Sequence, residues 1–257
     1  MFVKIQDLLK QKNVLHHANE GIEICLVKDS SVGVDLAASI LQIVADSQST
    51  LYLSGGKTPK ELYKRLADSE IDGGARFAPG AVGMVDERFG EKLHEKSNEL
   101  MLKEAGLLRY FDMLNIAFYP ILQTGTREDT AEAYDEKIRS LNAVFKRSIA
   151  VLGVGVDGHT AGVAPNRTGF KNPIFDPSQK HLLVSEFNDA KGMFKERVTM
   201  TFLGLSMMDL LLVLVFGADK KQALELLFRN GSEEDIPARF YKRPEIAGKT
   251  IIITDQT

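Results

Sequence analysis

The sequence predicts an α/β fold: a doubly wound, largely parallel sheet with helices on both faces. Short, continuously apolar runs alternate with segments of helical spacing along the chain, which is typical of parallel strands joined by crossover helices. No repeat, low-complexity tract or linker divides the 257 residues. We therefore expect a single α/β domain over residues 1–257.

Each expected element follows from its local pattern. The apolar runs predict strands at residues 22–27, 51–53, 81–85, 114–118, 149–154, 181–185, 198–202, 210–216 and 250–254. Helical spacing predicts helices at residues 32–44, 59–66, 98–106, 128–141 and 220–228. For the third of these helices, Ser97 is a typical N-cap and Gly106 a typical end.

The composition excludes several classes of protein. A net charge of −3 provides neither a basic surface for nucleic acid nor a polybasic patch for membranes. Cys25 is the only cysteine, which excludes an internal disulfide and is typical of a reducing compartment. Residues 1–12 lack a signal peptide, and the apolar run 210–216 is far shorter than the roughly 20 residues of a membrane span. We expect a cytoplasmic protein that binds a small molecule, with neither nucleic acid nor membrane as its partner.

Residues 148–165 form the most informative stretch. The apolar run 149–154 predicts a buried parallel strand, and the glycines that follow allow a sharp turn at its carboxyl end. This turn carries Asp157 and His159. Ligands of open α/β sheets bind at the carboxyl ends of the strands, so we expect these two side chains to lie at a binding site.

The same glycines also match the dinucleotide-binding pattern G-x-G-x-x-G. That interpretation requires a helix that begins at the third glycine, because its N-terminal N–H groups bind the pyrophosphate. The chain continues instead through Pro165, Asn166, Gly169, Pro173 and Pro177. A nicotinamide or flavin site is therefore not expected here.

A second candidate site is the turn Ser54-Gly55-Gly56-Lys57-Thr58-Pro59, between an expected strand and an expected helix. Thr58 is predicted as the N-cap, with Glu61 completing a capping box and Pro59 at the first helical position. Free N–H groups, the helix dipole and the Lys57 ammonium would converge on one point, which suits a phosphate dianion. An ordinary strand-to-helix turn, which uses glycine for its geometry alone, is the alternative.

A third candidate is the charged triplet Asp86-Glu87-Arg88, which directly follows the expected strand 81–85. Such a triplet is often a solvated loop. In a parallel sheet, however, it would open on the same edge as the other two turns. We therefore expect Asp86 and Arg88 to share a pocket with His159.

Together these segments resemble the 6-phosphogluconolactonase family, whose wider superfamily includes glucosamine-6-phosphate deaminase. The resemblance covers residues 30–254 and rests on four motifs, of which Asp-Gly-His-Thr-Ala is the most specific. They are Ser-Gly-Gly-x-Thr-Pro, Asp-Glu-Arg with Ser97-Asn98 downstream, Gly-x-Gly-x-Asp-Gly-His-Thr-Ala, and Arg197-Val198-Thr199. It implies a modified Rossmann-like domain that hydrolyses 6-phosphoglucono-δ-lactone in the oxidative pentose phosphate pathway without a cofactor or metal.

The resemblance also implies roles for the candidate residues. His159 would be the general base, and Asp157 would either hold its imidazole or shape the turn. Arg88 would face the substrate oxygens, with Asp86 orienting Arg88 or a sugar hydroxyl. Arg197 would bind the phosphate, together with the turn that comprises Ser54, Gly55, Gly56, Lys57 and Thr58.

Two alternatives remain open. A deaminase would carry Asn-Glu-Pro after its histidine motif, whereas this chain has Val163-Ala164-Pro165 and therefore no carboxylate there. A sugar-phosphate binding protein would keep the phosphate turn without needing His159. The chain also departs from the lactonase pattern at residues 89–96 and 162–164, which affects the pocket wall and the identity of the sugar.

Overall fold

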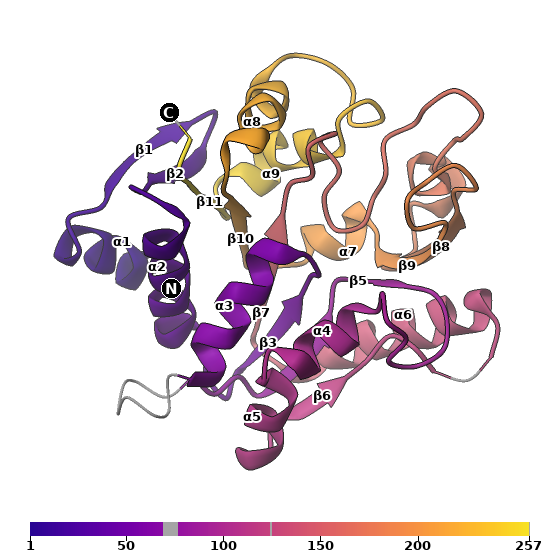
Figure 1. Ribbon diagram of the computed structural model, residues 1–257, viewed down its shortest axis with the longest axis horizontal. Helices are drawn as coiled ribbons and strands as arrows, with labels where there is room; N and C mark the ends of the chain where they lie inside the picture. The colour runs from indigo at the N-terminus through magenta and orange to yellow at the C-terminus, as the bar shows by residue number, and fades with distance from the viewer. Residues whose placement is uncertain (69–76, 124, 257) are drawn as a thin grey trace.

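The computed structural model describes residues 1–68, 77–123 and 125–256. Its main element is an eight-stranded sheet (Figure 1). Across the sheet the strands are β1 (Leu15–Asn19), β2 (Ile22–Leu26), β11 (Thr250–Thr254), β10 (Leu210–Val215), β7 (Arg147–Gly153), β3 (Ser49–Leu53), β4 (Ala81–Met84) and β6 (Ala117–Tyr119). Only the β1–β2 pair is antiparallel among these described strands. The predicted α/β class with a largely parallel sheet is confirmed.

The sheet is doubly wound about the β3–β7 pair. From β3 the chain builds outward through β4 and β6, and it then returns to place β7 on the other side of β3. From β7 it builds in the opposite direction through β10 and β11. The carboxyl ends of β3 and β7 therefore flank a topological switch point, where open α/β sheets bind ligands.

Helices cover the sheet, as the burial of its central strands requires. Every residue of β3, β10 and β11 is buried, which is the pattern of strands covered on both faces. Figure 1 shows α2 and α3 side by side, with α3 packed against the central strands β7 and β10. The helices are α1 (Phe2–Gln11), α2 (Ser30–Val44), α3 (Lys57–Asp68), α4 (Asn98–Glu104), α5 (Leu107–Met113), α6 (Arg127–Val144), α7 (Phe202–Ser206), α8 (Lys221–Phe228) and α9 (Pro244–Ala247).

A second, three-stranded antiparallel sheet lies beside the first, and the sequence did not predict it. It contains β5 (Asp86–Arg88), β9 (Glu196–Met200) and β8 (Val184–Asn188). The Asp-Glu-Arg triplet, expected as a loop, is thus a short strand whose Arg88 is paired in register with Arg197. This pairing brings two segments far apart in the sequence to the same edge of the pocket.

Element boundaries differ from prediction at several points. The pair α1 and β1 at the N-terminus was not predicted, and β6 begins only at Ala117 because α5 continues through Met113. The carbonyl of Gly56 accepts from Lys60 N, so α3 begins at Lys57 and the prediction of Thr58 as its N-cap is wrong. The cap of α4 is confirmed, since Ser97 Oγ accepts from Leu100 N at 2.8 Å.

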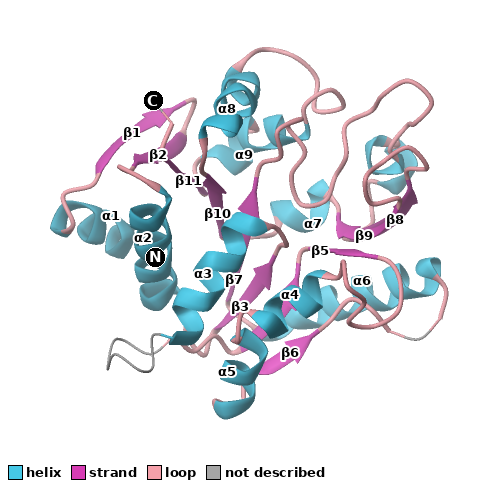
Figure 2. Ribbon diagram, in the orientation of Figure 1, coloured by secondary structure: helices cyan, strands magenta, loops and turns pink. Residues whose placement is uncertain are grey.

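The segment between β7 and β8 is largely loop (Figure 2). It contains two short 3₁₀ turns, Pro173–Phe175 and Pro177–Gln179. Residues 154–172, all of them described, form turns and isolated bridges without a helix. The helix that a dinucleotide fingerprint requires is therefore missing after Gly158. Within the described residues, no helix combines the length and hydrophobicity needed to cross a membrane.

Candidate functional site

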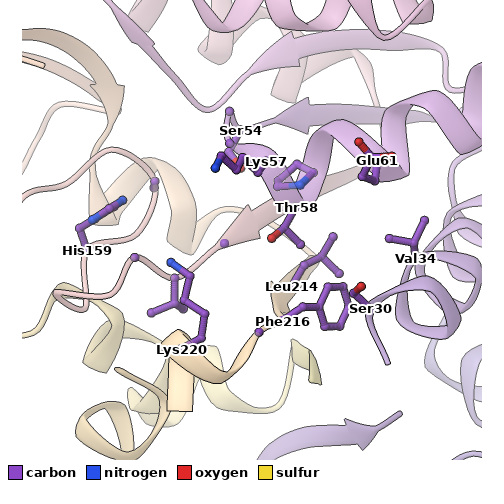
Figure 3. Close-up of a pocket in the computed structure, with 18 of the residues that line it drawn as sticks. Ser30, Val34, Ser54, Lys57, Thr58, Glu61, His159, Leu214, Phe216 and Lys220 are labelled. Atoms are coloured by element: carbon purple, nitrogen blue, oxygen red, sulfur yellow. The ribbon is translucent and has the colours of Figure 1, made fainter. Parts of the chain in front are cut away.

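A cavity of about 990 Å³ opens at the carboxyl ends of β3, β7 and β10. The predicted site residues all line it except Asp157, which contacts the imidazole of His159. They are Ser54, Gly55, Gly56, Lys57, Thr58, Asp86, Arg88, His159 and Arg197. In Figure 3 the side chains of His159, Lys57 and Lys220 lie around one common space. The fold thus brings the three sequence-predicted turns to one pocket.

The loop after β7 holds His159 through a compact set of hydrogen bonds. The N–H of Gly155 donates to the carbonyl of His159 at 2.8 Å, and the N–H of Gly158 donates to the carbonyl of Gly155 at 3.0 Å. The hydroxyl of the adjacent Thr160 donates to the carbonyl of Gly153 at 2.8 Å and contacts the hydroxyl of Tyr241 at 2.5 Å. Because Thr160 is fully buried, this network fixes the base of the loop.

The imidazole of His159 is oriented by Asp157. Asp157 Oδ1 lies 2.5 Å from His159 Nδ1 and also accepts from the backbone N–H of His159 at 3.2 Å. Partial burial raises the pKa of Asp157, but hydrogen bonds and the charge of His159 outweigh it and lower this pKa to about 2. An ionised carboxylate at Nδ1 requires the proton of a neutral imidazole to be on Nδ1. The Nε2 lone pair, which no described residue contacts by a hydrogen bond, is left available as an acceptor.

Gly155 is required for the position of the imidazole. A Cβ atom at residue 155 would lie 2.0 Å from Cε1 and 2.1 Å from Nδ1 of His159. Atoms at such distances overlap, so the ring can lie against the backbone only because residue 155 has no side chain. Asp157 can therefore hold the imidazole of His159 in this orientation only because residue 155 is glycine.

The N-terminus of α3 forms another wall of the cavity. Gly56 has φ +119°, a conformation that side chains rarely adopt, and Gly55 leaves room for the amide of Asn98. Since the first intrahelical bond runs from Lys60 N to Gly56 O, the N–H groups of Lys57 and Thr58 have no intrahelical acceptor. Their partial positive charge, together with the Lys57 ammonium, makes this helix end suitable for an anion.

Asp86 forms a buried ion pair with Arg197. The distance from Arg197 Nη1 to Asp86 Oδ2 is 2.9 Å, and the two side chains are 12% and 7% exposed. Of the two roles expected for Asp86, the orientation of Arg88 is wrong, because the partner of Asp86 is Arg197 on the neighbouring strand. The contact with a sugar hydroxyl stays a prediction. The pKa of Arg197 is lowered. Burial is the main cause and the positive charge of Arg88 adds to it, while the negative charge of Asp86 acts in the opposite direction.

Gly162 makes space for this ion pair. It has φ +68°, and a Cβ atom there would lie 2.7 Å from Asp86 Oδ2 and 3.0 Å from Arg197 Nη1. Gly162 is one of the residues at which the sequence departs from the lactonase pattern. A larger residue at position 162 would overlap the carboxylate of Asp86, and its positive φ would strain any other side chain.

Arg88 is held without a carboxylate partner among the described residues. Its Nη1 donates to the carbonyl of Lys96 at 2.7 Å, and its guanidinium lies 4.2 Å from the ring centroid of Phe194. Its Nε is buried without a hydrogen-bond partner in the described part of the chain. Arg88 lines the cavity, and only one N–H of its guanidinium binds Lys96, so its remaining Nη donors are suited to binding substrate oxygens.

Glu87, between Asp86 and Arg88, was not assigned a function from the sequence. It is fully buried and accepts from the backbone N–H groups of Arg88, Asn98 and Glu99 at 2.7, 2.7 and 2.9 Å. Burial raises its pKa to about 7, against the lowering effect of these three donors. Glu87 thus ties β5 to the N-terminus of α4, and it does not line the cavity.

Lys220 also lines the cavity and was missed in the sequence. It follows β10 in the turn Gly217-Ala218-Asp219-Lys220, where it was predicted only as the start of a helix. A search for cations that follow the carboxyl end of each strand would have found it.

The described residues contain no cluster of three or more His, Cys, Asp or Glu side chains that could hold a metal ion.

Known proteins resemble this chain over most of its length. The family model described as glucosamine-6-phosphate isomerases/6-phosphogluconolactonase matches residues 30–252. A 6-phosphogluconolactonase of Rhizobium meliloti is 31% identical over 209 residues, which are 81% of this chain and 84% of the relative.

Solved structures show the same fold. A 6-phosphogluconolactonase from Plasmodium vivax superposes with a TM-score of 0.75 at 18% identity, over 99% of this chain and 96% of that one. A monomeric glucosamine-6-phosphate deaminase superposes with a TM-score of 0.65 at 18% identity, over 90% and 95% of the two chains. At such low identity these two likenesses support the fold alone.

Proposed function

The chain belongs to the family of glucosamine-6-phosphate isomerases and 6-phosphogluconolactonases, and we propose that it is a lactonase that hydrolyses 6-phosphoglucono-δ-lactone to 6-phosphogluconate. One arrangement carries the proposal. His159 offers a free Nε2 to a cavity whose other wall is the N-terminus of α3. A base and an anion site on one cavity are what a phosphosugar hydrolase needs.

In the proposed mechanism, His159 Nε2 takes a proton from water as the water oxygen attacks the C1 carbonyl. Asp157 stabilises the imidazolium that forms, while Arg88 faces the oxyanion. When the intermediate collapses, the bond from C1 to the ring oxygen breaks, and the imidazolium returns its proton to that oxygen. The acid product then ionises to 6-phosphogluconate, so the step consumes one water and needs no redox partner.

The phosphate end is proposed to bind at the N-terminus of α3. Lys57 and Lys220 line the cavity, and neither has an ion-pair partner among the described residues. Arg197 adds a third cation that Asp86 neutralises only in part, since its guanidinium has further donors. Three cations and free helix N–H groups match a phosphate dianion.

The deaminase alternative lacks a supporting side chain at the position that the motif indicates. Val163 is fully buried and Ala164 is partly buried, so neither supplies a carboxylate that could orient the histidine. The carboxylate that reaches His159 comes from Asp157 instead. This arrangement favours the lactonase over the deaminase.

The test is a parallel rate assay with freshly prepared 6-phosphogluconolactone and with glucosamine 6-phosphate, corrected for spontaneous hydrolysis. We expect turnover of the lactone only, and His159→Asn should lower kcat about 10²- to 10⁴-fold. The dissociation constant for inorganic phosphate should stay unchanged in that variant. Turnover of glucosamine 6-phosphate would assign the chain to the deaminases, and phosphate binding without any turnover would make it a binding protein. A His159→Asn variant of normal activity would disprove the assignment of the base.

A further inference from the structure

The aromatic ring of Phe194 lies against both pocket arginines. Its centroid is 4.2 Å from Cζ of Arg88 and 5.4 Å from Cζ of Arg197. Both guanidinium groups line the cavity, whereas Phe194 itself does not. The ring is therefore placed to act on the arginines and not on the substrate.

These two arginines need to be held because their like charges repel. Arg88 and Arg197 are directly paired residues of β5 and β9. Asp86 compensates the charge of Arg197, but the guanidinium of Arg88 has only the carbonyl of Lys96 as a hydrogen-bond acceptor among the described residues. The face of an aromatic ring is negative and attracts cations, so Phe194 supplies attraction where Arg88 has no carboxylate.

The loop that carries Phe194 is anchored at its base. Residues 189–195 connect β8 to β9, and Asp189 N donates to the carbonyl of Lys195 at 2.7 Å. Asp189 is 2% exposed, and its carboxylate forms an ion pair with Arg167. Within this loop Met193 is 90% exposed, whereas Phe194 is half-buried over the arginines.

We propose that Phe194 is a positioning residue, which holds Arg88 and Arg197 in the orientation that binds the anionic substrate. This inference rests on the proposed function for its substrate, and it adds a residue that does not touch the substrate. A flexible aliphatic side chain at residue 194 would fill similar space without the negative ring face. The arginines would then sample more orientations, so the contact of Arg197 with the phosphate and the contact of Arg88 with the oxyanion would both weaken.

The experiment compares Phe194→Leu, Phe194→Tyr and the matched control Met193→Leu. We expect Phe194→Leu to raise KM for the lactone and Kd for inorganic phosphate about three- to tenfold. Its kcat should fall as well, because Arg88, which faces the oxyanion in the proposed mechanism, loses its ring contact while His159 and Asp157 stay in place. Phe194→Tyr keeps the ring and should retain wild-type values, as should Met193→Leu. Thermal unfolding of all variants shows whether the fold is intact, and Phe194→Met replaces Phe194→Leu if the latter is unstable.

Two results would overturn the proposal. Wild-type phosphate affinity in the folded Leu or Met variant would mean that the ring does not position the arginines. Equal weakening in the Tyr and Leu variants would mean that the ring face is not the cause. Calorimetric phosphate binding involves no turnover, so this arm tests Phe194 even if the wild-type protein fails to hydrolyse the lactone.

Discussion

The imidazole of His159 lies so close to the backbone of Gly155 that any side chain at residue 155 would displace the ring. The printed sequence shows Gly155 as the second glycine of a G-x-G-x-x-G pattern, which suggests close approach to a ligand. In the structure the close neighbour is instead the Cε1–Nδ1 edge of His159. The second glycine of this pattern therefore makes room for the imidazole of His159 and not for a dinucleotide.

Replacing Gly155 by alanine should inactivate the enzyme without unfolding it. A Cβ atom 2.0 Å from His159 Cε1 must push the ring away from Asp157, while the φ of residue 155 lies outside the range in which alanine is strained. A displacement of about 1 Å costs roughly 10²-fold in rate. We expect kcat for the lactone to fall by about this factor and the phosphate dissociation constant to stay within twofold.

Gly248→Ala is the control for this substitution, because nothing lies within 4 Å of a Cβ atom at residue 248. It should keep wild-type kcat. If Gly155→Ala also kept wild-type kcat, the orientation of His159 described above would be unimportant for turnover.

Sequence reasoning was most successful for residues whose role follows from their own strand or turn. His159, Lys57 and Arg88 follow the ends of neighbouring parallel strands, so their common location could be predicted from alternation alone. The partner of Asp86 could not be predicted. It depends on the pairing of β5 with β9, which joins residues 111 positions apart.

At the scale of single elements, the N-terminus of α4 is the clearest example of a contact that links two elements. Glu87 from β5 accepts from the first N–H groups of α4, while Ser97 caps the same helix from its own side. The cap at Ser97 was predicted because it is local. The contribution of Glu87 was not, because it depends on how β5 approaches the helix.

Glu87 should make stability depend on pH. Its pKa rises from an ordinary value of 4.5 to about 7 because of burial. Between these pH values the unfolded chain loses the proton that the folded chain retains, so the free energy of unfolding falls as the pH rises through this window. The full effect of a shift of this size is about 3 kcal/mol. We expect the melting temperature of the wild type to fall by several degrees between pH 5 and pH 7.5.

Glu87→Gln removes the titration, so its melting temperature should change less over the same range. Glu95→Gln, an exposed position in the following loop, serves as the control and should behave as the wild type. Identical pH profiles for wild type and Glu87→Gln would show that another group causes the dependence. All three profiles can be measured by calorimetry at constant ionic strength.

At the scale of the whole molecule, the cavity is lined by segments from Ser30 at the start of α2 to Asp255 after β11. The double winding about β3 and β7 brings these segments together, because the parallel strands of both halves of the chain end at the same edge of the sheet. The alternation of the sequence predicted this arrangement. Strands were expected at residues 181–185 and 198–202, close to β8 and β9, but β5 and the antiparallel pairing of the three were not predicted. That pairing joins segments far apart in the sequence, so no local pattern indicates it.

A ligand that contacts so many segments binds the folded chain only, and phosphate should therefore stabilise the protein. At a phosphate concentration of 100 times Kd the gain is about 2.7 kcal/mol, or about 5 to 10 °C in melting temperature for a chain of this size. Lys220→Ala removes one cation from the cavity and should raise the phosphate Kd about tenfold, which reduces the shift at the same phosphate concentration. Lys221→Ala removes an exposed lysine outside the cavity and should show the wild-type shift. Equal shifts in the two variants would mean that phosphate binds elsewhere, because only a site that includes Lys220 distinguishes these neighbouring lysines.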